Sequence, residues 1–182
     1  MILKQRKPNR LQGYDYAQDN LYFVTCCVQD RICCLGEIKN KQMQLNQYGE
    51  IAQQQWYWLG QQYPYIVLHA FVVMPNHIHG IIEINRGIVG TGRDLSLQQT
   101  GLSLQQTDLS PPQPIKIKSL SQLMGAYKTT TSKQIHLLGY NVFAWQRSFH
   151  DHIIRHEQSY EKISTYIHNN PAQWQEDKFY TL

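Results

Sequence analysis

The chain has 182 residues, a length that fits one domain with its own core and is short for two. Hydrophobic residues make up 42% and charged residues 16%, a balance that excludes a disordered chain, and no apolar stretch is long enough for a membrane span. Seventeen basic and thirteen acidic residues give a net charge of +4, and no apolar stretch of a secretory signal follows the N-terminal charges. These features predict a single cytoplasmic domain over residues 1–182.

The first half of the chain alternates between strand and helix patterns. β-branched and aromatic residues predict a strand over 21–28, followed by a second extended stretch near 32–38. Apolar residues at helical spacing predict a helix from about 46 to 63, where a proline ends it. Two strongly apolar runs, 65–73 and 78–84, predict paired central strands joined by a tight connection.

The second half begins with a low-complexity stretch over 85–114, in which a seven-residue unit rich in leucine and glutamine is repeated. Glycines and prolines surround the copies, so we interpret the stretch as a surface insertion. Beyond it, the pattern predicts a helix over 117–138, an extended segment over 142–149 and a last helix over 157–169. This order favours an α+β domain, in which helices pack on one face of a mostly antiparallel sheet.

Two regions of the chain are locally basic because they contain no acidic residue. Between Ser110 and His150 there is no Asp or Glu, and Arg10 belongs to an equally acid-free N-terminus. The basic residues of the Ser110–His150 segment are Lys116, Lys118, Lys128, Lys133 and Arg147. Lysine and arginine attract phosphates, and the interleaved aromatic rings offer faces for unpaired bases. The pattern favours nucleic acid as the partner, although a solvated helix face is an equal explanation of the charges alone.

Two histidines, His77 and His79, lie two residues apart where the second apolar run begins. On a strand, side chains at this spacing project from the same face, so the two imidazoles can reach one metal ion. Two histidines make an incomplete site, because a catalytic metal needs further ligands and an open position. Structural or surface histidines are the alternative interpretation.

The last predicted helix carries two residues that could complete a metal-dependent site with the two histidines. Tyr166 and Asn170 are four residues apart and share one helix face. A phenol can act as a nucleophile where a site stabilises the developing charge, and a divalent metal polarising a phosphate favours the attack. A packing role for Tyr166 and a helix-terminal role for Asn170 remain open.

These residues carry a family resemblance. The segment 74–80, Met-Pro-Asn-His-Ile-His-Gly, resembles the HUH motif (histidine, bulky hydrophobe, histidine) of single-tyrosine transposases. The segment 166–171, Tyr-Ile-His-Asn-Asn-Pro, resembles their tyrosine helix, and stretches 11–16, 21–25 and 145–155 extend the similarity. More narrowly, the chain resembles the REP-associated tyrosine transposases over nearly its whole length, the insertion excepted.

The resemblance implies a ferredoxin-like HUH endonuclease fold and a transposase that cleaves and rejoins single-stranded DNA near hairpins. In this family, His77, His79 and Asn170 would hold Mg²⁺ or Mn²⁺. Tyr166 would attack the scissile phosphate and form a 5′-phosphotyrosine intermediate. His152 and Arg155, from the stretch that precedes the last helix, join the basic residues above as expected DNA contacts. The resemblance also makes a homodimer an alternative to a monomer, with the protein associated with the nucleoid.

Competing functions make different demands on the same residues. A protein that binds DNA hairpins without cleaving them is the main alternative, yet all four expected site residues are present. A nucleotide hydrolase of the histidine-triad kind would need a third histidine at position 81, which is Ile81. The sequence therefore favours the transposase and endonuclease.

Overall fold

The computed structural model describes residues 10–90 and 116–180. In chain order, its elements are β1 (Asn20–Cys27), the short 3₁₀ helix η1 (Gln29–Arg31), β2 (Gly36–Lys39), β3 (Gln42–Leu45), α1 (Gln47–Gln62), β4 (Ile66–Met74), β5 (His77–Ile84), α2 (Gly87–Gly90), α3 (Leu120–Leu137), β6 (His150–Ile154), α4 (Glu157–Asn169) and the 3₁₀ segment η2 (Asn170–Glu176).

The main sheet has four antiparallel strands in the order β4-β5-β1-β6, while β2 and β3 form a separate hairpin. Pro75 and Asn76 alone connect β4 to β5, which confirms the predicted pair of central strands with a tight connection. Helix α1 follows the β2–β3 hairpin and leads into β4, and α3 precedes β6. The predicted α+β class with a ferredoxin-like antiparallel sheet is therefore confirmed.

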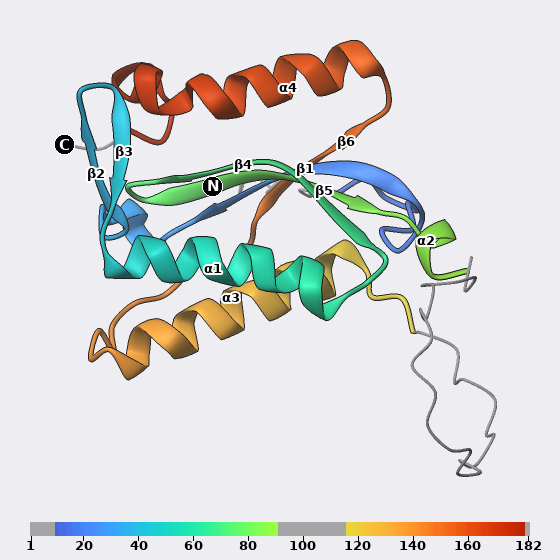
Figure 1. The fold of residues 1–182 in the computed structure, drawn as a ribbon, viewed down its shortest axis with the longest axis horizontal. Helices are drawn as coiled ribbons and strands as arrows, with labels where there is room; N and C mark the ends of the chain where they lie inside the picture. The colour runs from blue at the N-terminus through green and yellow to red at the C-terminus, as the bar shows by residue number, and fades with distance from the viewer. Residues whose placement is uncertain (1–9, 91–115, 181–182) are drawn as a thin grey trace, which may run out of the picture.

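The sheet separates two layers of helices, as Figure 1 shows. Helices α1 and α3 pack together on one face, where they form the predicted helical layer, and α4 lies across the opposite face. The larger hydrophobic core lies between the sheet and the α1–α3 layer. Beneath α4 there is a smaller cluster of buried residues, Ile81, Ile154 and Ile167. The face under α4 is thus less completely filled by apolar side chains.

Local sequence signals explain the helix boundaries. The side chain of Asn46 accepts hydrogen bonds from the backbone N–H groups of Tyr48 and Gly49, which caps α1. Ser119 and Gln122 cap each other's backbone N–H groups in a capping box at the start of α3. Both helices begin within three residues of the predicted positions, and α4 spans the predicted residues.

The structure corrects the extended segment predicted over 142–149. The strand that pairs with β1 is β6, which begins at His150, whereas Trp145 makes only an isolated bridge to Val28. The aromatic side chains of Phe143, Trp145 and Phe149 are buried in the larger core without a strand ladder. The apolar residues of 142–149 therefore indicate burial and not a strand. The edge strand β6 has a more polar sequence because one of its faces is exposed.

The predicted insertion over 85–114 lies mostly outside the described residues. Residues 87–90 form the short helix α2, and 91–114 belong to the part that the structure does not describe. The single domain over 1–182 therefore stays a prediction. Of the helices that are described, none combines the length and apolar character that crossing a membrane requires.

Candidate active site

The two histidines of the motif lie on β5 and point toward α4. In an antiparallel sheet, alternate residues share a face, and β5 pairs with β1 so that His79 is opposite Thr25 and His77 opposite Cys27. Both histidines are buried, and their Nε2 atoms are 3.0 Å apart. Ile78 and Gly80 face the larger core instead. The predicted convergence of both imidazoles on one point is present.

Neighbouring residues orient both rings. The Asn76 amide donates through Nδ2 to the backbone carbonyls of Phe179 (2.9 Å) and Arg31 (3.2 Å), so its Oδ1 accepts from His77 Nδ1 at 2.8 Å. The His77 proton therefore resides on Nδ1, and the Nε2 lone pair points toward His79. Thr25 Oγ1 forms a 2.8 Å hydrogen bond with His79 Nδ1. These partners are the kind that orient metal-binding histidines.

Burial keeps both histidines neutral. It lowers the pKa of His77 to about 3, and the positive charges of Lys178 and Arg31 act in the same direction. Burial, followed by the neighbouring His77, also lowers the pKa of His79 well below its ordinary value. Neutral imidazole is the form that binds metal ions, so both rings are ready to act as ligands at neutral pH.

Helix α4 brings the tyrosine to this pair. The Tyr166 hydroxyl lies 3.1 Å from His79 Nε2 and donates a hydrogen bond to Asp177 Oδ2, also at 3.1 Å. Burial and the nearby Asp177 carboxylate raise the pKa of the Tyr166 phenol. The phenol is therefore protonated, with its hydrogen directed at a carboxylate.

Asn170 lies one turn further along, as the four-residue spacing predicts. Its Nδ2 donates to Asp177 Oδ2 at 2.8 Å, which fixes the orientation of the amide because a carboxylate only accepts. The side chain is buried, and its Oδ1 atom has no hydrogen-bond partner among the described residues. A buried carbonyl oxygen without a donor is the state expected of an atom that binds a cation.

Asp177 is the site residue that the sequence did not reveal. It follows η2, and its carboxylate lies with His77 and His79 so that one ligand atom from each falls within 4.8 Å of the others. Two neutral imidazoles, a carboxylate and an unpaired amide oxygen suit a divalent cation. The side chains of this chain therefore fit a divalent metal ion.

Other candidates on α4 are kept away from the pair. The Tyr160 hydroxyl lies 3.2 Å from His69 Nδ1, and His69 Nε2 lies 3.0 Å from Glu83 Oε2. His168 is exposed, and its ring bonds to the backbone of the same helix. Tyr166 is thus the α4 tyrosine that contacts the histidine pair.

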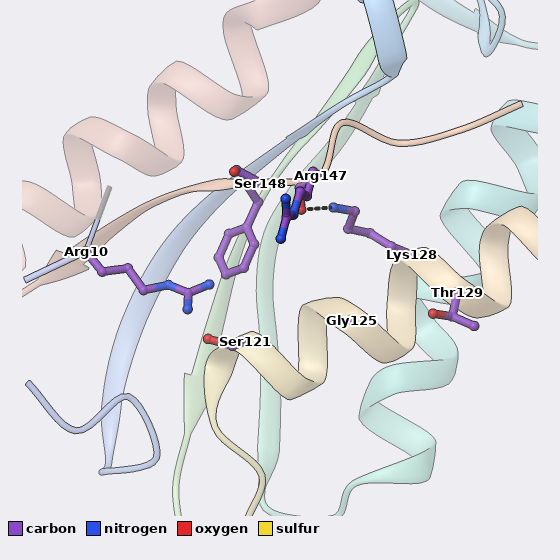
Figure 2. A pocket seen from close by; sticks show the side chains of 8 residues that line it. Arg10, Ser121, Gly125, Lys128, Thr129, Arg147 and Ser148 are labelled. Atoms are coloured by element: carbon purple, nitrogen blue, oxygen red, sulfur yellow. Dashed lines mark hydrogen bonds between the residues drawn. The ribbon is translucent and has the colours of Figure 1, made fainter. Parts of the chain in front are cut away.

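The basic residues predicted to bind DNA lie in separate places. Arg10, Lys128 and Arg147 line one hollow, which Figure 2 shows, and Lys133 lines a neighbouring one. His152 and Arg155 line a third hollow next to β6. Two further lysines belong to the segment before α3: Lys116 is exposed, and Lys118 is held by Tyr63, whose hydroxyl accepts its hydrogen bond. Their contact with DNA stays a prediction.

Comparisons with known proteins agree with this architecture. No protein-family model matches the chain. A Haemophilus influenzae protein named only as uncharacterized is 34% identical over 179 residues, which cover 98% of this chain and 94% of the relative. Among solved structures, a REP-associated tyrosine transposase bound to a REP hairpin matches with a TM-score of 0.56. The match covers 93% of this chain and 76% of that one, at 17% identity, and therefore establishes a shared fold.

Proposed function

We propose that this chain, which belongs to the same protein family as the Haemophilus influenzae relative, is a metal-dependent transposase of the HUH class. It would cleave and rejoin single-stranded DNA next to hairpins, in the cytoplasm at the nucleoid. The observation that carries the proposal is the position of the Tyr166 hydroxyl, 3.1 Å from one of two neutral, converging histidines. The fold shared with a hairpin-bound transposase supports the same conclusion.

The proposed ligands of the metal are His77, His79 and Asn170, and we include Asp177 because its carboxylate lies close to both histidines. The Nε2 atoms of the two neutral imidazoles converge on one point, and the Asn170 Oδ1 atom is buried without a donor among the described residues. Bound Mg²⁺ or Mn²⁺ would supply positive charge that polarises the scissile phosphate. Asn76 and Thr25 would keep both rings in orientation.

Tyr166 would perform the covalent step. Its phenol oxygen forms a bond to the phosphorus while the bond from phosphorus to the 3′ oxygen breaks, which leaves a 5′-phosphotyrosine and a 3′-hydroxyl. The phenol proton is already directed at Asp177, which is placed to accept it, and the departing 3′ oxygen takes up one proton. The phosphotyrosine keeps the energy of the broken ester bond, so a 3′-hydroxyl can reverse the step and rejoin the strand.

The principal alternative is a protein that binds hairpins and does not cleave them. Such a protein has no use for the buried Asn170 Oδ1 atom, which has no hydrogen-bond donor among the described residues. A buried acceptor without a donor lowers the stability of the fold. Retention of this arrangement therefore favours the enzyme.

A covalent-trapping experiment tests the proposal. The protein is incubated with labelled single-stranded hairpins from its own genome, with and without Mg²⁺ or Mn²⁺, and separated on a denaturing gel. We expect a metal-dependent adduct that Tyr166→Phe abolishes. Tyr160→Phe is the matched control, because the hydroxyl that it removes from the same helix contacts His69 and not the His77–His79 pair. An adduct that persists in Tyr166→Phe would assign the nucleophile elsewhere.

The same assay addresses the proposed homodimer. Tyr166→Phe and His77→Ala are each expected to be inactive alone. If the tyrosine of one copy serves the histidines of another, a mixture of the two variants regains adduct formation. If each copy acts alone, the mixture stays inactive.

A further inference from the structure

We propose that Arg31 is a positioning residue of the candidate metal site, which fixes the chain segment 177–179 so that the Asp177 carboxylate faces the histidine pair. The inference rests on the proposed function, because it takes Asp177 as a ligand of the proposed metal ion. Arg31 belongs to η1, an element separate from both the histidine strand β5 and the tyrosine helix α4. Its role is to hold the C-terminal ligand in place, and it acts through that ligand.

The backbone at Arg31 is strained. Its φ angle is 56° and that of Asp30 is 55°, so two consecutive residues with side chains adopt the left-handed region. This region costs free energy for residues other than glycine, because the Cβ atom crowds the backbone. Asn40 and Lys41 also have positive φ angles, but they form the two-residue turn of the β2–β3 hairpin, where such angles are usual. Arg31 instead connects strands of two different sheets, so its strain points to the contacts that it makes.

The contacts of Arg31 join η1 to two other parts of the chain. Its backbone carbonyl accepts a hydrogen bond from Asn76 Nδ2 at 3.2 Å, in the connection between β4 and β5. Its guanidinium group donates through Nη1 to the backbone carbonyl of Lys178, also at 3.2 Å. The Cζ atom of the same group lies 5.4 Å from the centroid of the Phe179 ring, within the range of a cation–π contact. The main chain and the side chain of Arg31 thus hold both sides of the histidine motif's entry.

The segment that Arg31 contacts carries the site carboxylate. The Phe179 carbonyl accepts a hydrogen bond from Asn76 Nδ2 at 2.9 Å, and the Phe179 N–H donates to Asp177 Oδ1 at 2.6 Å. The second carboxylate oxygen, Oδ2, is the one that accepts from Tyr166. The position of Asp177 therefore depends on Phe179, which is held between Asn76 and Arg31. Contacts of this kind orient metal ligands without binding the ion.

The charge of Arg31 opposes a cation at the site. After burial and the charge of Lys178, it is among the causes that lower the pKa of His77. The same repulsion acts on a divalent cation bound by the histidines. Removal of the charge alone would therefore strengthen metal binding, whereas loss of positioning would weaken it. A purely electrostatic role and a positioning role thus predict effects of opposite sign.

Calorimetry of Mn²⁺ binding measures this sign in the absence of DNA. We expect Arg31→Gly to weaken Mn²⁺ binding by about 10-fold, the lower end of the range for groups that orient a ligand, because Arg31 acts through Phe179. Arg86→Gly is the matched control and should leave the affinity unchanged. It removes the same exposed side chain just beyond the end of β5 opposite to His77, where the guanidinium bonds to Asp19. Unchanged or stronger Mn²⁺ binding in Arg31→Gly would overturn the inference.

A double-mutant cycle shows whether Arg31 acts through Asp177. Asp177→Ala removes the carboxylate, so Arg31→Gly should cause no further loss of Mn²⁺ affinity in that background. An equal loss in both backgrounds would show that Arg31 acts by another route and would overturn the assignment. Mn²⁺ affinity that Asp177→Ala leaves unchanged would overturn it as well.

Two metal-free measurements separate positioning from a general structural role. In hydrogen exchange followed by NMR, the Phe179 N–H, which bonds to Asp177, should exchange faster in Arg31→Gly than in Arg86→Gly. The melting temperature should fall no further in Arg31→Gly than in Arg86→Gly, because glycine adopts a positive φ angle without strain. A larger fall, with faster exchange throughout the chain, would assign Arg31 to the stability of the whole fold and would overturn the inference.

Failure of the proposed function has a different signature. If trapping yields no adduct while Arg31→Gly weakens Mn²⁺ binding as described, the positioning role stands and the metal belongs to a protein that does not cleave. If the unmodified protein forms the adduct while Arg31→Gly binds Mn²⁺ normally, the enzyme stands and the positioning role does not.

Discussion

Gly80, the last residue of the histidine motif, is predicted to be required by packing rather than by chemistry. A Cβ atom at this position would lie 2.5 Å from Cζ2 and 2.6 Å from Cη2 of Trp56, and 3.1 Å from Cδ2 of Phe71. Trp56 is fully buried and stacks on Phe71, with ring centroids 4.6 Å apart and an interplanar angle of 10°. Tyr127 meets the indole ring edge-on from α3. The indole therefore has no free direction in which to move.

The cost of Gly80→Ala follows from this geometry. Inserting a methyl group into a filled core costs about 1–3 kcal/mol. Replacing glycine by alanine in a strand returns roughly 0.5–1 kcal/mol, because the unfolded chain loses freedom. The contacts of 2.5 and 2.6 Å place the substitution in the upper part of that cost range, at about 2–3 kcal/mol. We therefore expect Gly80→Ala to lower the free energy of unfolding by about 1–2.5 kcal/mol, measured by urea denaturation followed by circular dichroism.

A double-mutant cycle with Trp56→Phe checks the cause. The smaller ring makes room for the methyl group, so Gly80→Ala should cost little in the Trp56→Phe background, with a coupling of at least about 0.5 kcal/mol. The reasoning is refuted if Gly80→Ala is as stable as the unmodified protein. It is refuted equally if the substitution costs the same in both backgrounds.

Three further outcomes are expected. Asn76→Ala should weaken Mn²⁺ binding by about 10- to 100-fold in calorimetry, because His77 loses its orienting partner; unchanged affinity would remove Asn76 from that role. Ser119→Ala should lower the free energy of unfolding by about 1 kcal/mol through loss of the α3 cap, and a value near zero in urea denaturation would contradict the capping box. In thiol labelling of the native protein, the exposed Cys33 should react first. Cys26, whose pKa burial raises to about 12, should react only on unfolding, and early labelling of it would indicate local opening.

Much of the fold could be predicted because its elements carry strong local signals. The helix over 157–169 and the strand pair around Asn76 follow from periodicity and from a tight connection. The sequence predicts an extended segment over 142–149, ahead of the observed strand β6. The reason is that Phe143 and Trp145 bury their rings in an irregular segment, whereas β6 has polar residues on its exposed face. A pattern of apolar residues indicates which side chains are buried. It indicates a strand only where the buried residues also pair with a neighbouring strand.

The candidate site was predictable where its residues share one element. His77 and His79 lie on one strand, and Tyr166 and Asn170 lie on one helix, so spacing alone placed each pair. Asp177 was not predictable, because it reaches the histidines only after η2 turns the chain back toward the sheet. The spacing of residues along one helix or strand does not predict where the chain turns back toward the sheet.

The position of Tyr166 depends on polar contacts more than on the core. Ile167 is the one buried side chain of α4. Hydrogen bonds hold both ends of the helix, from Tyr160 to His69 at one end and from Tyr166 to Asp177 at the other. Asp177 therefore has two roles that a single substitution removes together, since its carboxylate both faces the histidines and holds α4. A loss of metal affinity in Asp177→Ala indicates ligation only if Tyr166→Phe leaves that affinity intact, because Tyr166→Phe breaks the same hydrogen bond without removing a proposed ligand.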